Sequence, residues 1–443
     1  MAMEELPRGF GLSTSTYVVI ASMVGTGILV SPGYMMASLK NYPVIFGLWA
    51  LGGLLALCGA LCVAELAVAM PRAGGEYVYL REAYGPMPAF LSGWTSFFVG
   101  FSAPLAVVGY VAASYLLTPF HLVEDETGQM VKIAAAIIIV AVTLPNLVGH
   151  RQSAWTQNLT TILKLALFVV LVVAAFLFGD GRLAHLSQGQ SVGKVGLGTV
   201  ATQLFYVMFA YSGWNAASYM AGEVKNPAKT LPRSLLLGTG LVIVLYLALN
   251  LVFAYAVPLT AVGFDNAEQV PQIAVRNLFG AKASSVFNVV LGLTFLATVS
   301  AFVITGPRIY YAMAKDGLFP SLAGHVSPKG RVPVYAMISQ SACAIIILFV
   351  TDFQNLYRYT SVGLSVFALL IIGAVYVLRW RRPDMERPFR LPGYPVVPAI
   401  FLVVILFMTG FAFKQWPKPS AYSIGSILAG IPVYYLWSFV RRR

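Results

Sequence analysis

The chain has 443 residues, of which 58% are hydrophobic and 10% are charged, and its formal net charge is +13. A soluble domain carries roughly a quarter of charged residues, so this composition excludes an ordinary soluble protein and predicts a chain that lies in a lipid bilayer. The positive charges lie mainly in predicted loops, so they indicate membrane topology rather than nucleic-acid binding.

Apolar segments of about 20 residues, long enough to cross a hydrocarbon core of about 30 Å, recur along the chain. We count twelve, with predicted starts near Ser13, Val44, Met87, Val131, Leu159, Val200, Ser234, Val286, Val334, Tyr359, Val396 and Ala421. The prediction is an all-α polytopic membrane protein with twelve transmembrane helices in the plasma membrane or the bacterial inner membrane. An even number of crossings, together with the loop charges, places both termini in the cytoplasm. The first apolar run is too long for a signal peptide, so we expect it to be retained.

The first predicted span carries Gly25-Thr26-Gly27 at its centre. Glycine in a helix interior costs about 1 kcal/mol relative to alanine, so the pattern predicts a break, although small residues can also serve close helix packing. An unwound stretch frees backbone groups that lipid cannot satisfy. The N-terminal end of the half-helix beyond the break carries partial positive charge and free N–H donors, which suit a carboxylate.

After the second span, residues 71–86 combine Arg, Glu, Tyr and Gly side chains. This composition fits a cytoplasmic gate and fits an amphipathic interfacial loop equally well. The cysteines and histidines lack the spacing of metal ligands, and we expect no metal or other cofactor. They are Cys58, Cys62 and Cys343 in predicted spans, and His121, His150, His185 and His325 in loops.

In the fifth predicted span, Lys164 lies nine residues past Trp155, a predicted interfacial anchor. At 1.5 Å per residue this places the lysine about 13 Å along the helix, near the middle of the membrane. A charge there costs at least roughly 2.5 kcal/mol, which marks a functional candidate. Lys164 is either a fixed cation that braces the first broken span or a titrating group that couples proton flow to substrate. The alternative is that its side chain snorkels to an interface.

The sixth predicted span carries Tyr211-Ser212-Gly213-Trp214 at its centre. Two interrupted helices in matching positions of two repeats are the best sequence pointer to a transporter site. Carbonyls released by this second break suit an ammonium group, so the two breaks together predict a receptor for a free α-amino acid. No acidic residue lies mid-span, which favours a neutral side chain. No acid/base pair or metal cluster shares a depth, so we do not expect an enzyme.

Several segments, in matching order, resemble the amino acid–polyamine–organocation superfamily, in particular L-type amino acid transporters and their bacterial relatives. They are residues 24–28, 71–80, 84–86, 157–164, 209–215 with 223–227, and 308–317. The resemblance implies a LeuT-like 5+5 inverted repeat with broken helices one and six. It makes residues 1–443 a single transporter domain, with repeats 13–178 and 200–380 and two peripheral spans in 396–440.

The resemblance also implies roles for individual residues. The backbone of Gly25, Thr26 and Gly27 would hold the substrate carboxylate, and Met23 would line the site. The carbonyls of Phe209, Ala210 and Ser212 would receive the amino group. Phe209 would also close over the substrate on the outer side, while Tyr211 and Phe302 would shape the side-chain pocket. Lys164 matches a lysine of sodium-independent members.

The predicted function is sodium-independent secondary transport of neutral L-amino acids by alternating access, as an exchanger or a proton-coupled symporter. One alternative is a cationic amino acid or polyamine transporter on the same fold. Another is a sensor or channel that does not transport. The expected partners are the amino acid and the lipid bilayer, without nucleic acid. The resembling animal transporters bind a heavy chain through an external cysteine, and residues 117–130 contain none, so we expect no such disulfide-linked partner.

Overall fold

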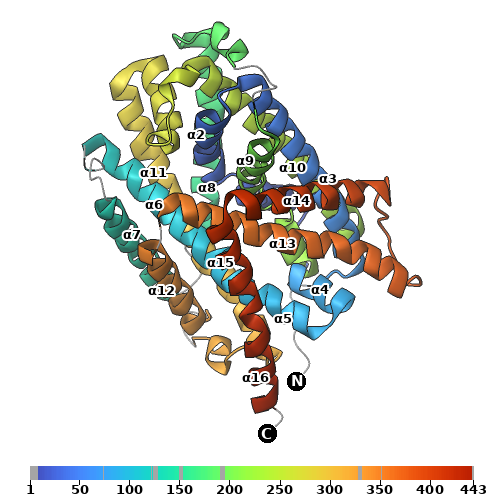
Figure 1. Ribbon diagram of the computed structural model, residues 1–443. Helices are drawn as coiled ribbons and strands as arrows, with labels where there is room; N and C mark the ends of the chain where they lie inside the picture. Colours follow the sequence, from blue (N-terminus) through green and yellow to red (C-terminus); the bar gives the residue numbers. More distant parts are fainter. Residues whose placement is uncertain are drawn as a thin grey trace.

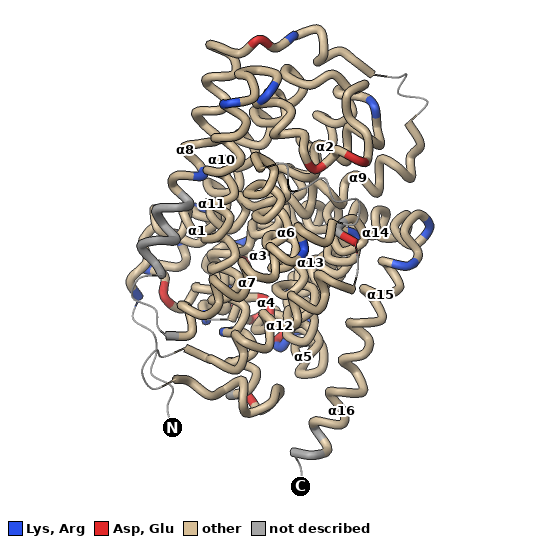
Figure 2. The backbone as a smooth tube through the Cα atoms, turned by 90° about the vertical axis from the view of Figure 1, so that its left-hand side faces the viewer, with Lys and Arg blue, Asp and Glu red and all other residues tan. Residues whose placement is uncertain are grey.

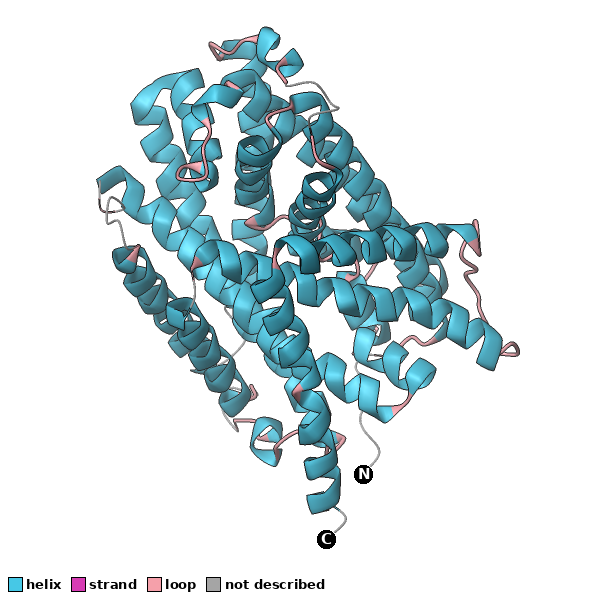
Figure 3. Ribbon diagram, viewed as in Figure 1, coloured by secondary structure: helices cyan, strands magenta, loops and turns pink. Residues whose placement is uncertain are grey.

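The computed structural model describes residues 8–72, 74–120, 122, 128–148, 153–189, 195–327, 332–350 and 352–441. Regular structure in these ranges is helical, as Figure 3 shows. The strand-like pairings found there are two isolated bridges, Phe10 with Val224 and Asn41 with Gly189. The predicted all-α class is therefore confirmed for the part of the chain that the structure describes.

Sixteen α-helices follow one another along these residues (Figure 1). The first eight are α1 (Leu12–Met23), α2 (Gly27–Leu39), α3 (Tyr42–Ala69), α4 (Glu76–Tyr84), α5 (Pro86–Thr95), α6 (Ala103–Leu117), α7 (Gln129–Val148) and α8 (Ser153–Phe178). The others are α9 (Leu197–Ala210), α10 (Pro227–Ala256), α11 (Val270–Lys315), α12 (Val334–Val350), α13 (Phe353–Arg381), α14 (Val396–Gln415), α15 (Pro417–Leu428) and α16 (Gly430–Arg441).

Short helical pieces join several of these helices. The π-helix η1 (Ser96–Ser102) links α5 to α6 within the third predicted span. The remaining pieces are 3₁₀ turns, namely η2 (Thr118–Phe120), η3 (Leu183–Ser187), η5 (Ala216–Glu223), η6 (Leu259–Ala261), η7 (Ala267–Gln269) and η8 (Ser321–Gly324). Neither the π-helix nor η5 follows from the hydropathy pattern, because that pattern reports burial and not the pitch of a helix.

Each of the twelve predicted span starts lies within a helix or at its first residue. Within the described residues, seven helices are individually long and apolar enough to cross a membrane, and the bent pair α1 and α2 makes an eighth. The chain is thus a multi-pass membrane protein. Interruptions divide some predicted spans into shorter helices, so twelve spans and the inverted repeat stay predictions.

Large apolar side chains remain exposed along several helices, which fits a lipid-facing surface. On α8, Val169, Val170, Val173 and Leu177 are each at least half exposed. The backbone tube is tan, and so neither acidic nor basic, over most of its length (Figure 2). The first and last described residues lie toward the same end in Figures 1 and 2, together with α4 and α5. Which side of the membrane that end faces stays a prediction.

The two broken spans lie side by side. Helix α2 packs on α9, and α1 packs on η5, while α10 packs on both α1 and α3. Glycine allows the close approach of α10, because a Cβ on Gly238 would lie 2.7 Å from the Cβ of Val19 on α1. Small residues therefore bring the backbones of these helices together around the interruptions.

Candidate functional site

The first break lies between Met23 and Gly27. Helices α1 and α2 meet there at a bend of 40°. The N–H of Gly25 donates to the carbonyl oxygen of Met23 at 2.8 Å, which is a tight turn rather than a helical bond, and the N–H of Leu29 then bonds to the oxygen of Thr26 at 3.0 Å. The N–H groups that open α2 have no acceptor one turn earlier in the helix. The predicted interruption of the first span is confirmed.

The second break separates α9 from η5. After Ala210 the chain turns through Gly213, whose φ is +101°, and the N–H of Ser212 donates to the oxygen of Phe209 at 3.0 Å. A side chain at position 213 is excluded twice, since this φ strains any L-residue and a Cβ would lie 2.7 Å from the oxygen of Ser22 on α1. The predicted interruption of the sixth span is confirmed.

The two breaks are in direct contact. A Cβ on Gly27 would lie 2.4 Å from the Cα of Ala210, so the start of α2 and the end of α9 touch through their backbones. Met23, Thr26 and Ala210 are each 2% exposed. The structure therefore brings together Met23, Gly25, Thr26, Gly27, Ala210 and Ser212 of the predicted site, with Gly25 and Ser212 half-buried and the other four buried.

Sequence reasoning missed Tyr246 of α10, which joins the two breaks. Its hydroxyl lies 2.7 Å from the oxygen of Met23 and 3.1 Å from the oxygen of Ala210, and it is placed to donate to either. Both carbonyls are released from regular helical bonding by the breaks. Tyr246 is fully buried, and its ring meets Trp49 edge-on at 5.6 Å. From the sequence, a tyrosine within an apolar run does not reveal that its hydroxyl donates to backbone carbonyls of other helices.

Tyr211 packs between α3 and α10. Its ring centre lies 5.6 Å from that of Trp49 and 5.1 Å from that of Tyr246, and its hydroxyl donates to the oxygen of Trp49 at 3.2 Å. These contacts place Tyr211 as a brace of the second break. Its predicted part in a side-chain pocket stays a prediction.

Phe302 lies on α11 and contacts residues of η1 and α12. Its ring centre is 6.1 Å from that of Phe101 of η1, and its carbonyl oxygen accepts from Gln340 at 2.9 Å. These contacts do not include either break. The proposed role of Phe302 in substrate selection therefore stays a prediction as well.

Phe209 belongs to a layer of aromatic rings beside the breaks. Its ring centre is 4.3 Å from that of Tyr357 on α13, which stacks on Tyr206 at 4.9 Å, and Tyr206 stacks on Tyr34 of α2 at 5.4 Å. The hydroxyl of Ser31 ties the layer to α2, at 2.7 Å from both the oxygen of Tyr206 and the hydroxyl of Tyr357. We call Tyr34, Tyr206, Phe209 and Tyr357 the aromatic plug.

Lys164 is buried, with 2% of its surface exposed, and does not snorkel to an interface. Its Nζ donates to Thr298 at 3.3 Å and lies 5.9 Å from the ring centre of Phe295. Both residues belong to α11, so the hydrogen bond of Lys164 goes to this helix and not to the first broken span. The side chains of Trp155 and of residues 157–161, to which the interfacial anchor and part of the family motif were assigned, lie outside the described residues.

Residues 74–84 contact the part of the sixth span that follows the second break, and the turn after α11. The N–H of Gly74 donates to the oxygen of Tyr219 at 3.3 Å, and Asn215 donates to the carboxylate of Glu76. Tyr77 donates to Asp316 at 2.6 Å. The segment is therefore fastened to η5 and to the turn after α11.

Glu76 has an unusual protonation equilibrium. Burial raises the pKa of Glu76 to about 7, although hydrogen bonds from Tyr219 and Asn215 lower it. The ordinary value is 4.5, so this carboxyl group titrates near neutral pH.

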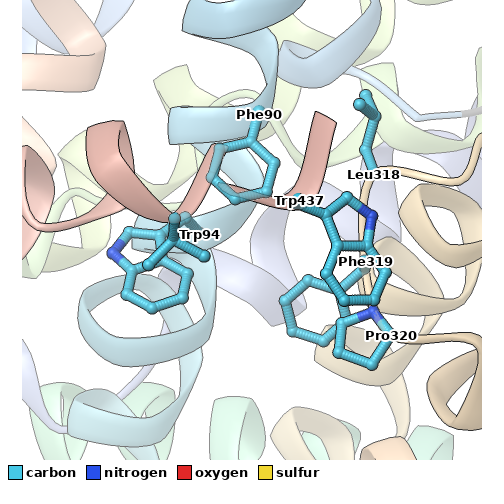
Figure 4. A pocket seen from close by; sticks show the side chains of 7 residues that line it. Phe90, Trp94, Leu318, Phe319, Pro320 and Trp437 are labelled. Carbon is cyan, nitrogen blue, oxygen red and sulfur yellow. The ribbon is translucent and has the colours of Figure 1, made fainter. Parts of the chain in front are cut away.

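A separate hollow of about 220 Å³ lies between α5, the residues after α11 and α16 (Figure 4). It is lined by Phe90, Trp94, Leu318, Phe319, Pro320, Val433 and Trp437. The two indole N–H groups are already used, by the oxygens of Ser426 at 2.8 Å and Gly317 at 2.7 Å. A cavity that offers only carbon to its contents does not suit a zwitterion, so we do not place the substrate site there.

In the described part of the chain, no group of three His, Cys, Asp or Glu side chains is placed to hold a metal ion. Cys58 and Cys62 lie on α3 and Cys343 lies on α12, and all three are free thiols. The expectations of no cofactor and no disulfide-linked partner stay predictions.

Comparison with known proteins gives consistent matches over almost the whole chain. The family model described as amino acid permease matches residues 10–436. The b(0,+)-type amino acid transporter 1 of Mus musculus is 28% identical over 98% of this chain and 89% of its own length. The serine/threonine exchanger SteT of Bacillus subtilis (strain 168) is 27% identical over 97% of both chains. The large neutral amino acids transporter small subunit 2 of Rattus norvegicus is 26% identical over 97% of this chain and 81% of its own.

Proposed function

The chain belongs to the amino acid permease family of the amino acid–polyamine–organocation superfamily and is an amino acid transporter, and we propose that it moves neutral L-amino acids without sodium by alternating access. The proposal rests on one observation above all, the contact between two interrupted helices at Gly27 and Ala210. Unwound backbone inside a membrane persists only where it is buried in protein or lines a cavity, and transporters use it to bind substrate.

In this proposal the two breaks bind the two ends of the zwitterion. The N–H groups of Thr26 and Gly27 take the carboxylate, helped by the positive end of α2, and the N–H of Gly25 joins them once it leaves the oxygen of Met23. The oxygens at Phe209, Ala210 and Ser212 take the ammonium. A carbonyl oxygen has two lone pairs, so the bond that Ala210 accepts from Tyr246 leaves one acceptor position on its oxygen.

Entry of the substrate requires movement, because the breaks touch and are buried. We propose that the aromatic plug closes the path on the predicted external side and that residues 74–84 close it on the predicted cytoplasmic side. Opening one closure while the other stays shut gives alternating access. The gate interpretation of residues 71–86 is supported by the hydrogen bonds that Gly74, Glu76 and Tyr77 of this segment make.

The substrate class is proposed from the residues and from the named relatives. The relatives' names cover serine and threonine, large neutral amino acids, and cystine with glutamate, so they agree on the amino acid and differ on its side chain. A neutral side chain is favoured because none of the acidic residues lies in the middle of a predicted span. A cationic substrate is the second candidate, and the aromatic rings near the breaks are the feature that favours it.

We propose that Lys164 supplies a fixed positive charge where other transporters use a sodium ion. Its burial against α11 supports this role. Burying a charged side chain within a membrane protein costs free energy, and such residues mark functional sites. The alternative is that Lys164 titrates and couples proton flow to transport. In that case the protein is a proton-coupled symporter rather than an exchanger.

The test is uptake by purified protein in liposomes. We expect a panel of labelled serine, leucine, arginine and glutamate to show saturable uptake of the neutral amino acids, unchanged when sodium is replaced by choline. Dependence on internal amino acid at fixed pH identifies exchange, and uptake driven by a pH gradient alone identifies proton coupling. A strict sodium requirement, or a preference for arginine, would overturn the corresponding part of the proposal. Linear, unsaturable flux would indicate a channel.

We further propose that the protein works without a disulfide-linked heavy chain, since its three cysteines lie in helices. Electrophoresis of cell membranes with and without reductant tests this. A larger species that disappears on reduction would contradict it.

A further inference from the structure

The apolar hollow between α5, α16 and the residues after α11 includes no residue of the two breaks (Figure 4). Its walls are aromatic rings and aliphatic side chains, and the N–H groups of Trp94 and Trp437 are already bonded to backbone oxygens. A polar ligand would find no partner among these side chains, and a polar group that is buried without a hydrogen bond costs free energy. The lining therefore suits a ligand that presents only carbon and hydrogen.

Close packing at two glycines fixes the walls of the hollow. A Cβ on Gly430, the first residue of α16, would lie 2.7 Å from Leu91 and 2.8 Å from Trp94 of α5. A Cβ on Gly93 of α5 would lie 1.9 Å from the sulfur of Met313 on α11. Helix α5 is thus held against both of its neighbours, and the hollow is already formed without a ligand, as small-molecule sites usually are.

The walls of the hollow continue into the lipid-facing surface. On α16, the exposed side chains of Leu436 and Phe439 lie on either side of the wall residue Trp437 along the chain, and Leu322 after α11 is exposed as well. Their exposed fractions are 66%, 56% and 61%. Apolar side chains that stay exposed on a membrane protein face hydrocarbon. Lipid is therefore the medium next to the hollow.

The volume of the hollow suits part of a lipid chain. A dry apolar cavity of about 150 Å³ takes up a benzene molecule, so the 220 Å³ found between these helices accommodates a longer run of carbons. An empty hollow would leave its lining atoms without van der Waals partners on one side. A stable protein interface needs about 20–30 residues a side, far more than the seven that line this hollow.

We propose that the hollow binds one hydrocarbon chain of a membrane lipid. The turn after α11 connects this lipid site to residues 74–84. The oxygen of Gly317 accepts from Trp437 at 2.7 Å, and the neighbouring Asp316 accepts from Tyr77 at 2.6 Å and from Arg81 at 2.9 Å. A bound chain stabilises the packing of the same turn to which residues 74–84 are fastened. The lipid site does not depend on which amino acid is transported.

Tryptophan fluorescence tests the site, because Trp94 and Trp437 line it and bromine on a lipid chain quenches indole emission on contact. Purified protein in detergent is titrated with phosphatidylcholine that carries dibrominated acyl chains. We expect a saturable phase of quenching, in addition to the gradual quenching of exposed indoles. Val433→Phe, which fills the hollow, should raise the half-saturation concentration about fivefold or more. Leu436→Phe, which places the same ring on the exposed side of α16, should leave it within twofold.

Two further variants keep the test decisive if Val433→Phe folds poorly. Trp94→Phe and Trp437→Phe should each remove part of the saturable amplitude. Trp380→Phe is their control, because this indole is exposed on α13, and it should lower only the gradual phase.

Three outcomes would overturn the lipid site. The first is a wild-type titration without a saturable phase. The second is equal half-saturation in the wild type and a folded Val433→Phe variant. The third is a saturable phase that is present in the monomer fraction from gel filtration and absent from a dimer fraction, which would assign the hollow to a contact between two copies of the chain.

Discussion

At the residue scale, Tyr246 carries the first prediction. Replacing Tyr246 with Phe keeps the ring that packs on Trp49 and removes the hydroxyl that serves Met23 and Ala210. A buried polar group that loses its partner costs about 1–3 kcal/mol, so we expect amino acid binding to weaken about fivefold or more and the melting temperature to fall. Binding is measured by substrate-induced thermal stabilisation of the purified protein.

The matched control is Tyr255→Phe on the same helix. Tyr255 also donates to a carbonyl, that of Gly179 at 3.2 Å, but its partner lies far along the chain from either break. We expect Tyr255→Phe to leave binding unchanged. Equal binding constants for the wild type and Tyr246→Phe would show that the hydroxyl has no part in shaping the site.

Lys164 gives the second prediction. Lys164→Ala should remove the buried charge, leave the fold intact and reduce transport at least tenfold, measured as initial uptake into liposomes of equal protein content. Thr298→Val, which removes only the hydrogen-bond partner, should reduce transport less, because the cation itself remains. Wild-type rates in the alanine variant would mean that the lysine is idle in transport.

Glu76 gives the third prediction, on pH. Its folded-state pKa of about 7 lies above the ordinary 4.5, so the folded protein keeps a proton that the unfolded chain releases across this window. The contribution of Glu76 to the free energy of unfolding is therefore fully present below pH 4.5 and is lost as the pH rises toward 7. The loss is at most about 1.4 kcal/mol for each unit by which the folded and unfolded pKa values differ. Glu76→Gln should flatten the decline of melting temperature between pH 5 and pH 8. Glu82→Gln on the same helix is the control, and an unchanged slope for Glu76→Gln would contradict the assignment.

At the scale of elements, the interruptions of the first and sixth spans carry the fourth prediction. Gly213→Ala forces a side chain into a left-handed conformation and against Ser22, and Gly27→Ala forces one against the backbone of Ala210. Each variant should lower the melting temperature and abolish substrate-induced stabilisation. Gly240→Ala is the control, since nothing lies within 4 Å of a Cβ at that position of α10, and it should stabilise the protein by about 0.5–1 kcal/mol. Wild-type binding in Gly213→Ala would exclude the second break from the site.

The positions of the breaks could be predicted from sequence, because the glycines of Gly25-Thr26-Gly27 and of Tyr211-Ser212-Gly213-Trp214 stand out in apolar runs. Which side chains support the released carbonyls could not, since Tyr246 is more than thirty positions from the second break and many more from the first. The same limit explains Lys164, whose depth follows from its place in the span but whose partner Thr298 depends on how α8 packs on α11. Periodicity reports which face of a helix is buried and not which neighbour covers it.

The third span shows a different limit. Phe97, Phe98 and Phe101 lie in η1, and the wider π-helical turn changes the directions in which these rings project. No residue pattern distinguishes this turn from a regular helix, so the contact of Phe101 with Phe302 could not be predicted.

At the scale of the whole molecule, one ion cluster ties distant segments together and gives the fifth prediction. Glu65 of α3 accepts two hydrogen bonds from Arg379 of α13, at 2.9 and 2.6 Å, and one from the N–H of Leu391 at 2.6 Å. Removing one partner of a buried pair costs about 3–5 kcal/mol, so Glu65→Gln should lower the melting temperature markedly. Arg379 is partly exposed, which places the expected loss at the lower end of that range.

Glu82→Gln provides the comparison, because it breaks the more exposed pair with Arg382 at 2.7 Å. Such pairs contribute about 0–1 kcal/mol, so its melting temperature should stay close to that of the wild type. Equal losses in the two variants would show that Glu65 has no special part in joining α3, α13 and the segment before α14.

The membrane class of the molecule followed from composition alone, because a chain with 10% charged residues cannot cover a soluble surface. The number of crossings is harder to derive. Length and hydropathy define a span only while the helix is continuous, and the first and sixth spans, whose breaks form the candidate site, are interrupted. The residues that form the site therefore also make the number of membrane crossings hard to derive from the sequence.

The hydroxyl of Tyr246 carries a single hydrogen, yet two oxygens lie within its reach, at 2.7 and 3.1 Å. While α1 and α9 stay together the hydrogen can be shared. In the proposed transport cycle, parting of α1 and α9 would leave this hydrogen with one of the two oxygens, and the other oxygen would gain a vacant lone pair. The rearrangement that opens the pathway would thus create an extra acceptor for an incoming ammonium at the moment when one is needed.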